Sequence, residues 1–150
     1  LYDIMVATAA ENDRPADVAG LKANRETVLE ALPELQPRAK TILELIDLAQ
    51  FIYVVRPLVI EPAAAQQLTP ETRLLLKQFG SIAGDLPEWS VAALDAAARS
   101  FAEARGLKLG KVAQPLRAAL TGRTVSPGIF EVMILIGKTE SLARLADQAG

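Results

Sequence analysis

Apolar residues recur at intervals of three and four positions along most of the chain, which places them on one face of an α-helix. Residues 41–55 give the clearest example, with Ile42, Leu45 and Ile46 on one broad apolar face. No Asn-Gly or Asp-Gly hairpin signal interrupts the pattern. We therefore expect an all-α protein of about nine helices. The expected helices include residues 2–10, 15–32, 41–55, 70–84, 91–105, 111–120, 129–136 and 139–148.

Proline, glycine and hydroxyl residues mark the expected helix ends. Thr69 and Ser90 precede helical patterns and are expected N-caps, and Ser126 is expected to cap the helix that starts at residue 129. Pro33 is expected to end the second helix. An extended segment at residues 58–60 separates the two halves, so we expect two small helical subdomains, residues 1–57 and 58–150.

The length and composition are those of a globular protein. The 150 residues are 51% apolar and 23% charged, which suits one domain or two small helical ones. No stretch reaches the roughly 18 apolar residues of a membrane span, and no secretory signal is present, so we expect no membrane partner. Because the chain starts at Leu1 in a helical pattern, we expect a fragment of a longer protein.

Cysteine and histidine are both absent from the sequence. The lack of cysteine excludes disulfides, zinc knuckles and thiol chemistry, and it is consistent with a cytoplasmic protein. The lack of histidine removes the usual general base and the commonest metal ligand. Since no glycine-rich phosphate loop appears either, we expect no catalytic site, no metal and no cofactor within this chain.

The net charge of −2 is unevenly distributed. Residues 1–104 hold nine Lys and Arg against fifteen Asp and Glu, whereas residues 105–150 hold seven against three. A basic end on an acidic chain is typical of a protein with one surface that faces a polyanion. An ordinary solvated surface would give the same count.

Two arginines are candidate contacts to single-stranded RNA. Arg117 follows Pro115 by two positions, and its planar guanidinium could read or stack on a base. The alternative is a surface arginine whose stem packs on Leu120. Arg38 lies at an expected helix start with little nearby to neutralise it, and by itself it indicates nothing.

Residues 126–130 offer a second kind of contact. The segment Ser126, Pro127, Gly128 begins a helix whose backbone N–H groups could face a phosphate. Ile129 or Phe130 could support a splayed base, and core packing is the alternative for both.

Residues 110–138, GKVAQPLRAALTGRTVSPGIFEVMILIGK, resemble the C-terminal end of the bacterial glutamyl-tRNA synthetases. The family succession is Gln-Pro-Leu-Arg, Ala-Leu-Thr-Gly, Ser/Thr-Pro, Phe-Glu and Leu-Gly-Lys, and this sequence follows it without an internal gap, with Ile136 in place of the last leucine. Residues 36–41 and Trp89 with its following helix also match in order and spacing. The resemblance is sharp over residues 107–145 and loose over residues 1–35 and 57–88.

The resemblance implies a helical-cage anticodon-binding region made of two all-α subdomains, cut from a class I synthetase whose catalytic domain is absent here. The parent enzyme would use ATP and Mg²⁺ to attach glutamate to tRNA(Glu), and the resemblance leaves open whether tRNA(Gln) is charged as well. A cytoplasmic monomer is expected. By motif match, Arg38 is similar to the arginine that inspects the third anticodon base. The positions around the first two bases match Arg117, Ser126, Pro127, Ile129 and Phe130.

A second function remains open at this stage. A helical domain whose basic C-terminal face meets an acidic protein would show the same helices and the same charge split.

Overall fold

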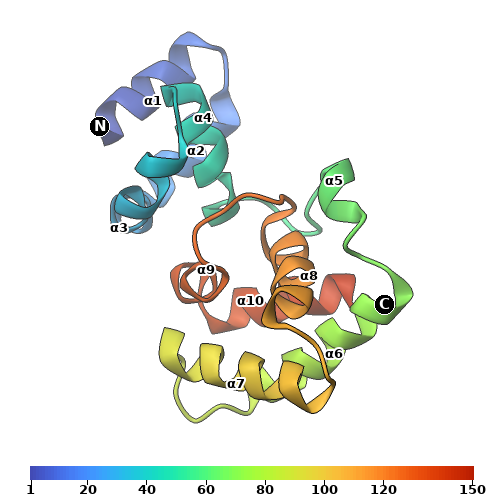
Figure 1. Cartoon of the computed structure of the whole chain (residues 1–150). Coiled ribbons are helices and arrows are strands. Elements are labelled where there is room, and N and C mark those ends of the chain that lie inside the picture. Colours follow the sequence, from blue (N-terminus) through green and yellow to red (C-terminus); the bar gives the residue numbers. More distant parts are fainter. The chain divides into compact units, whose positions relative to one another are not determined.

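The computed structural model describes all 150 residues as helices and connecting segments, with no β-strand, which confirms the all-α prediction (Figure 1). The chain divides into two compact units, Leu1–Val55 and Arg56–Gly150. None of the helices combines the length and the apolar character that a membrane span requires. The α-helices are α1 (Tyr2–Glu11), α2 (Pro15–Ala23), α3 (Arg25–Leu35), α4 (Ile42–Ala49), α5 (Pro62–Ala65), α6 (Pro70–Gly84), α7 (Val91–Ala104), α8 (Leu109–Thr121), α9 (Ile129–Ile136) and α10 (Lys138–Gln148).

In the first unit, α1 packs against α2 and α4, and α3 packs against α4. Helix α4 contributes Leu45, Ile46 and Ala49 to the core, as its apolar face predicts. The other fully buried side chains of this core include Met5, Leu21, Val28 and Leu35.

The region predicted as one helix over residues 15–32 is two helices, α2 and α3. Both the predicted continuity and the predicted end at residue 32 are therefore wrong. The helix stops at Asn24, where the backbone and side-chain amides of Asn24 both donate to the Gly20 carbonyl. Pro33 lies inside α3 and does not end it. The helix continues to Leu35 because burial of Leu32 and Leu35 outweighs the one backbone hydrogen bond that proline removes.

The helix predicted over residues 41–55 is shorter than expected. Thr41 is its N-cap, since its hydroxyl accepts a hydrogen bond from the Glu44 N–H, and the α-helix ends at Ala49. Short 3₁₀ helices flank it at Gln36–Arg38 and Gln50–Ile52. Arg38 is thus the last residue of the 3₁₀ helix that precedes α4.

A polar network ties α2 to the end of α4 in the first unit. The buried Asp17 carboxylate accepts hydrogen bonds from Arg14 Nε at 2.7 Å, Gln50 Nε2 at 3.0 Å and the Tyr53 hydroxyl at 2.6 Å. Burial alone would raise the pKa of Asp17, but these three donors hold it below its usual value. Gly20 lies directly under this network, because a Cβ there would stand 2.2 Å from the Tyr53 ring.

The depressed pKa of Asp17 predicts a pH-dependent contribution to stability. A carboxylate whose pKa is lower when folded stabilises the native state above its unfolded pKa of about 4, and this stabilisation is lost as the pH falls further. Asp17→Asn should therefore lower the free energy of unfolding by about 1–2 kcal/mol near neutral pH. The difference from wild type should shrink below about pH 4. Hydrogen exchange of α4 amides across a pH series measures it, and a difference that is constant with pH would contradict the prediction.

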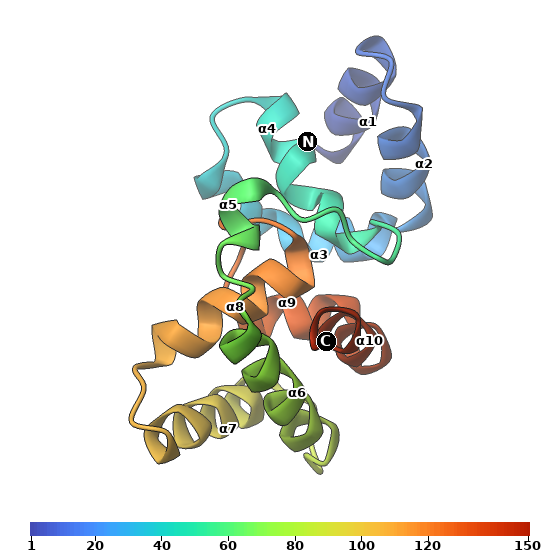
Figure 2. The same cartoon turned by 90° about the vertical axis from the view of Figure 1, so that its right-hand side faces the viewer.

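In the second unit, α8 lies at the centre and packs against α6, α7, α9 and α10 (Figures 1 and 2). The predicted caps at Thr69 and Ser90 are confirmed, since each hydroxyl accepts a hydrogen bond from the N–H three residues later. The core is formed by Phe79, Leu94, Leu116, Leu120, Met133 and Leu145.

Two expectations around α8 and α9 are corrected. Helix α8 begins at Leu109, before the predicted start, and it includes Pro115. The N-cap of α9 is Gly128, and the Ser126 side chain caps nothing in that helix. The Ser126 hydroxyl instead bonds to the Pro127 carbonyl and to α8, as described below.

Candidate functional site

The α8–α9 loop (residues 122–128) brings five of the six predicted site residues into one region of the second unit. Arg117 comes from the last part of α8, Ser126 and Pro127 from the loop itself, and Ile129 and Phe130 from the first turn of α9. The sixth residue, Arg38, belongs to the first unit and is described separately.

The start of the α8–α9 loop is fixed by its neighbours. Gly122 has a left-handed backbone with φ +73°, and a Cβ there would stand 2.6 Å from the Val59 carbonyl oxygen, so only glycine fits without strain. The Gly122 carbonyl accepts the Glu61 N–H at 2.8 Å. The Thr121 hydroxyl donates to the Arg117 carbonyl at 2.8 Å and accepts the Arg123 N–H at 3.1 Å. These contacts set where the loop leaves α8.

Arg117 is held across the loop by Ser126. Its Nε donates to Ser126 Oγ at 2.9 Å, and its terminal nitrogen NH1 lies 3.5 Å from Gln114 Oε1, one turn earlier on α8. Arg117 is half-buried, whereas Ser126 is only 8% exposed. The guanidinium therefore stands at the surface with its inner nitrogen anchored.

The apolar residues predicted beside Arg117 point mainly inward. Ile129 and Phe130 are 4% and 8% exposed, and Pro127 is also buried, so their side chains largely form the floor of the site. The exposed apolar side chain of the loop is Val125, at 54%. Sequence reasoning missed Val125. The exposure of Val125 could have been expected from its position beside Thr124, in a loop rich in residues that favour turns.

Arg38 ends the 3₁₀ helix after α3, and its charge is paired. The guanidinium donates to the Glu34 carbonyl and lies 3.5 Å from the Glu34 carboxylate, one turn earlier. The expectation that little neutralises Arg38 locally is therefore wrong. The pair is exposed, so it stabilises the fold little and leaves the side chain accessible to a ligand.

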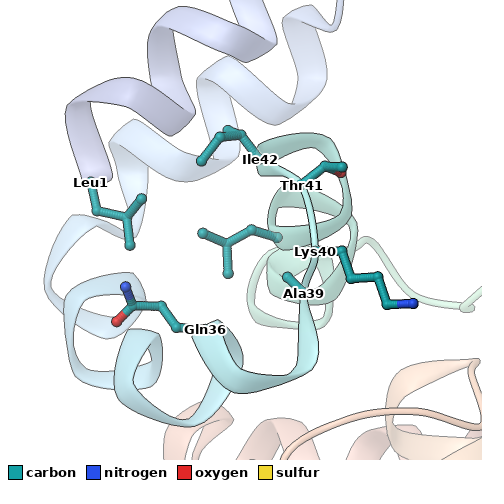
Figure 3. A pocket seen from close by; sticks show the side chains of 7 residues that line it. Leu1, Gln36, Ala39, Lys40, Thr41 and Ile42 are labelled. Carbon is teal, nitrogen blue, oxygen red and sulfur yellow. The ribbon is translucent and has the colours of Figure 1, made fainter.

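A shallow pocket of about 270 Å³ lies in the first unit and is lined by residues of α4 and of the segment before it, together with Leu1 (Figure 3). Leu45 and Ile42 form its apolar part, Gln36 lies on its rim, and the Lys40 side chain points away from it (Figure 3). The Lys40 backbone N–H is occupied by Glu44 Oε2 at 2.7 Å. Gln36 and Ala39, which line the pocket, are neighbours of Arg38 in the sequence.

The basic end of the chain is less basic at its surface than its composition indicates. Arg144 is 1% exposed, with its Nε on Glu140 at 2.9 Å and its NH1 on the Leu120 carbonyl at 2.7 Å. It therefore ties α10 to the end of α8. Lys108 and Lys111, at the start of α8, are exposed cations.

The family of anticodon binding domains matches residues 6–149, and the chain belongs to this family. Among curated relatives, glutamate–tRNA ligase 1 of Brucella melitensis is 47% identical over 152 residues, which cover 100% of this chain and 32% of the relative. Glutamate–tRNA ligase 2 of Brucella ovis gives the same identity and coverage. The chain thus spans roughly a third of the length of the curated relatives it matches.

Two solved structures share the fold. A crystal structure of a glutamate tRNA ligase from Elizabethkingia meningosepticum, in complex with its amino acid, matches 99% of this chain and 30% of its own, with a TM-score of 0.75 and 23% identity. Glutamate-tRNA synthetase from Elizabethkingia anophelis matches 93% of this chain and 28% of its own, with a TM-score of 0.69 and 23% identity. These likenesses agree with the all-α fold.

Proposed function

We propose that this chain is the anticodon-recognition region of a glutamate–tRNA ligase, and that it binds the anticodon loop of tRNA(Glu) without catalysing the reaction itself. The observation that carries the proposal is the 47% identity to Brucella glutamate–tRNA ligases over the whole chain. The match of residues 6–149 to the anticodon binding domains supports the same role.

The α8–α9 loop suits the recognition of unstacked bases. Anticodon bases can be splayed out and read on their pairing edges, which present acceptors to a guanidinium fork. Arg117 supplies that fork at the surface, over a floor of Pro127, Ile129 and Phe130. We assign this region to the first two anticodon bases.

Arg38 supplies a second guanidinium in the first unit, and we assign it to the third anticodon base. Its exposed pairing with Glu34 can be exchanged for a base contact at small cost, because an exposed ion pair contributes little.

The parent enzyme would use ATP and Mg²⁺ and would act as a cytoplasmic monomer. The residues of this chain bring no group of three His, Cys, Asp or Glu side chains close enough to hold a metal ion. We propose that ATP and Mg²⁺ bind to other parts of the parent enzyme. The contribution of this chain is to bind and orient the tRNA.

A gel-shift assay with three transcripts tests the proposal. The chain should bind tRNA(Glu) and should lose roughly tenfold or more in affinity when the anticodon alone is exchanged, since each base contact contributes on the order of 1–3 kcal/mol. A tRNA(Gln) transcript shows whether that tRNA is accepted as well. Equal affinity for all anticodons would overturn the proposal. That result would favour a helical interaction domain whose basic face meets an acidic protein.

A further inference from the structure

We infer that Ser126 is a positioning residue for Arg117 and does not itself contact the RNA. The inference rests on the proposed function. It assigns base recognition to Arg117 and the orientation of the Arg117 side chain to Ser126. It also changes the role that motif matching gives to Ser126.

The O–H donor of Ser126 and one of the two lone pairs on its oxygen are already used in hydrogen bonds. A serine hydroxyl has one O–H donor, and here it donates to the Pro127 carbonyl at 2.7 Å. Its oxygen accepts the Nε–H of Arg117 at 2.9 Å. With the side chain 8% exposed, no donor is left for a base and little of the oxygen is accessible to one.

The hydrogen bond from Arg117 Nε to Ser126 Oγ determines how the guanidinium is oriented. Nε is the inner nitrogen of the guanidinium, so fixing it fixes the plane in which the two terminal nitrogens lie. The Ser126 hydroxyl is itself fixed by its own bond to the Pro127 carbonyl. An arginine held in this way loses less side-chain entropy when it binds a base, which increases affinity.

Capping of α9 does not explain the arrangement of Ser126. The N-cap is Gly128, and both hydrogen-bond partners of Ser126 Oγ, the Pro127 carbonyl and Arg117 Nε, lie outside α9. The Glu131 carboxylate folds back over the first turn of α9, since a Cβ on Gly128 would stand 2.6 Å from its oxygen, and an acid there suits the helix dipole. The start of α9 is therefore stabilised without Ser126.

A double-mutant cycle on the whole chain tests the inference by fluorescence anisotropy with labelled tRNA(Glu). Ser126→Ala should weaken binding roughly 3–10-fold, as expected for one lost hydrogen bond that orients a charged group. In the Arg117→Ala background the same change should have no further effect, because a residue that acts through another is non-additive with it. Ser126→Thr keeps the hydroxyl and should restore binding. The exposed Ser100→Ala on α7 is the matched control.

An NMR measurement keeps the test independent of small stability changes. The Arg117 Nε–H signal should be protected from solvent exchange in wild type and Ser126→Thr, and unprotected in Ser126→Ala. Equal losses of affinity from Ser126→Ala with and without Arg117 would overturn the inference and leave the proposed function standing. Wild-type binding that is indifferent to the anticodon would instead overturn the proposed function.

Discussion

Replacing Arg144 by leucine is expected to lower the free energy of unfolding of the second unit by about 3 kcal/mol, because it removes a buried guanidinium that serves a buried carbonyl and a partly exposed glutamate. The Arg144 guanidinium is buried between Glu140 and the Leu120 carbonyl, at the C-terminal end of α8. Leucine would leave that carbonyl without its donor and the Glu140 carboxylate without its cation. The α8–α9 loop begins directly after this point, so the same change should loosen the site.

Urea denaturation followed by the fluorescence of Trp89 measures this effect, because the single tryptophan lies in the second unit. Arg99→Leu is the matched control: Arg99 also pairs with an acid four residues earlier, Asp95, but on the exposed face of α7. The control should lose much less stability. Equal losses in the two variants would show that the buried contacts of Arg144 do not hold α8 and α10 together.

Arg117→Ala is expected to weaken binding of tRNA(Glu) about 10–100-fold, the loss that follows removal of charge-assisted hydrogen bonds to a base. The melting temperature should fall by no more than about 2–4 °C, as for a change at a half-exposed position. Arg117→Lys should recover little of the affinity, because a single ammonium cannot reproduce the planar fork.

Lys111→Ala, on the exposed side of the same helix, is the control for charge alone. It should weaken binding slightly, to the same extent for every tRNA, and with a reduced dependence on salt. If Arg117→Ala lowers the melting temperature strongly and leaves affinity unchanged, Arg117 is a structural residue.

The fold class follows directly from the sequence, because the period of the apolar residues and the caps at Thr69 and Ser90 are local signals. The boundaries that failed depend on packing between helices. Pro33 reads as a helix end, yet burial of Leu35 keeps α3 intact beyond it. The helix break at Asn24 could not be predicted, because neither neighbour of Asn24 is a proline or a glycine.

The candidate site residues could be named from the sequence, but their exposure, and their pairing apart from that of Arg38, could not be predicted from it. Composition alone cannot separate Arg117, at the surface, from Arg144, in the core, because that difference arises from tertiary contacts. The inward direction of Phe130 and the exposure of Val125 are likewise set by the packing of α9. The pairing of Arg38 was accessible to sequence reasoning, since Glu34 precedes it by four residues.

Binding of single-base variants of the tRNA(Glu) anticodon by wild type and by Arg117→Ala tests the central claim, that one anchored guanidinium reads a base. For wild type, changing the base that Arg117 contacts should cost roughly tenfold or more in affinity. For Arg117→Ala the same base change should cost nothing further, while changes at the other positions keep their effect. If both proteins discriminate equally at all three positions, Arg117 reads no base and the account is contradicted.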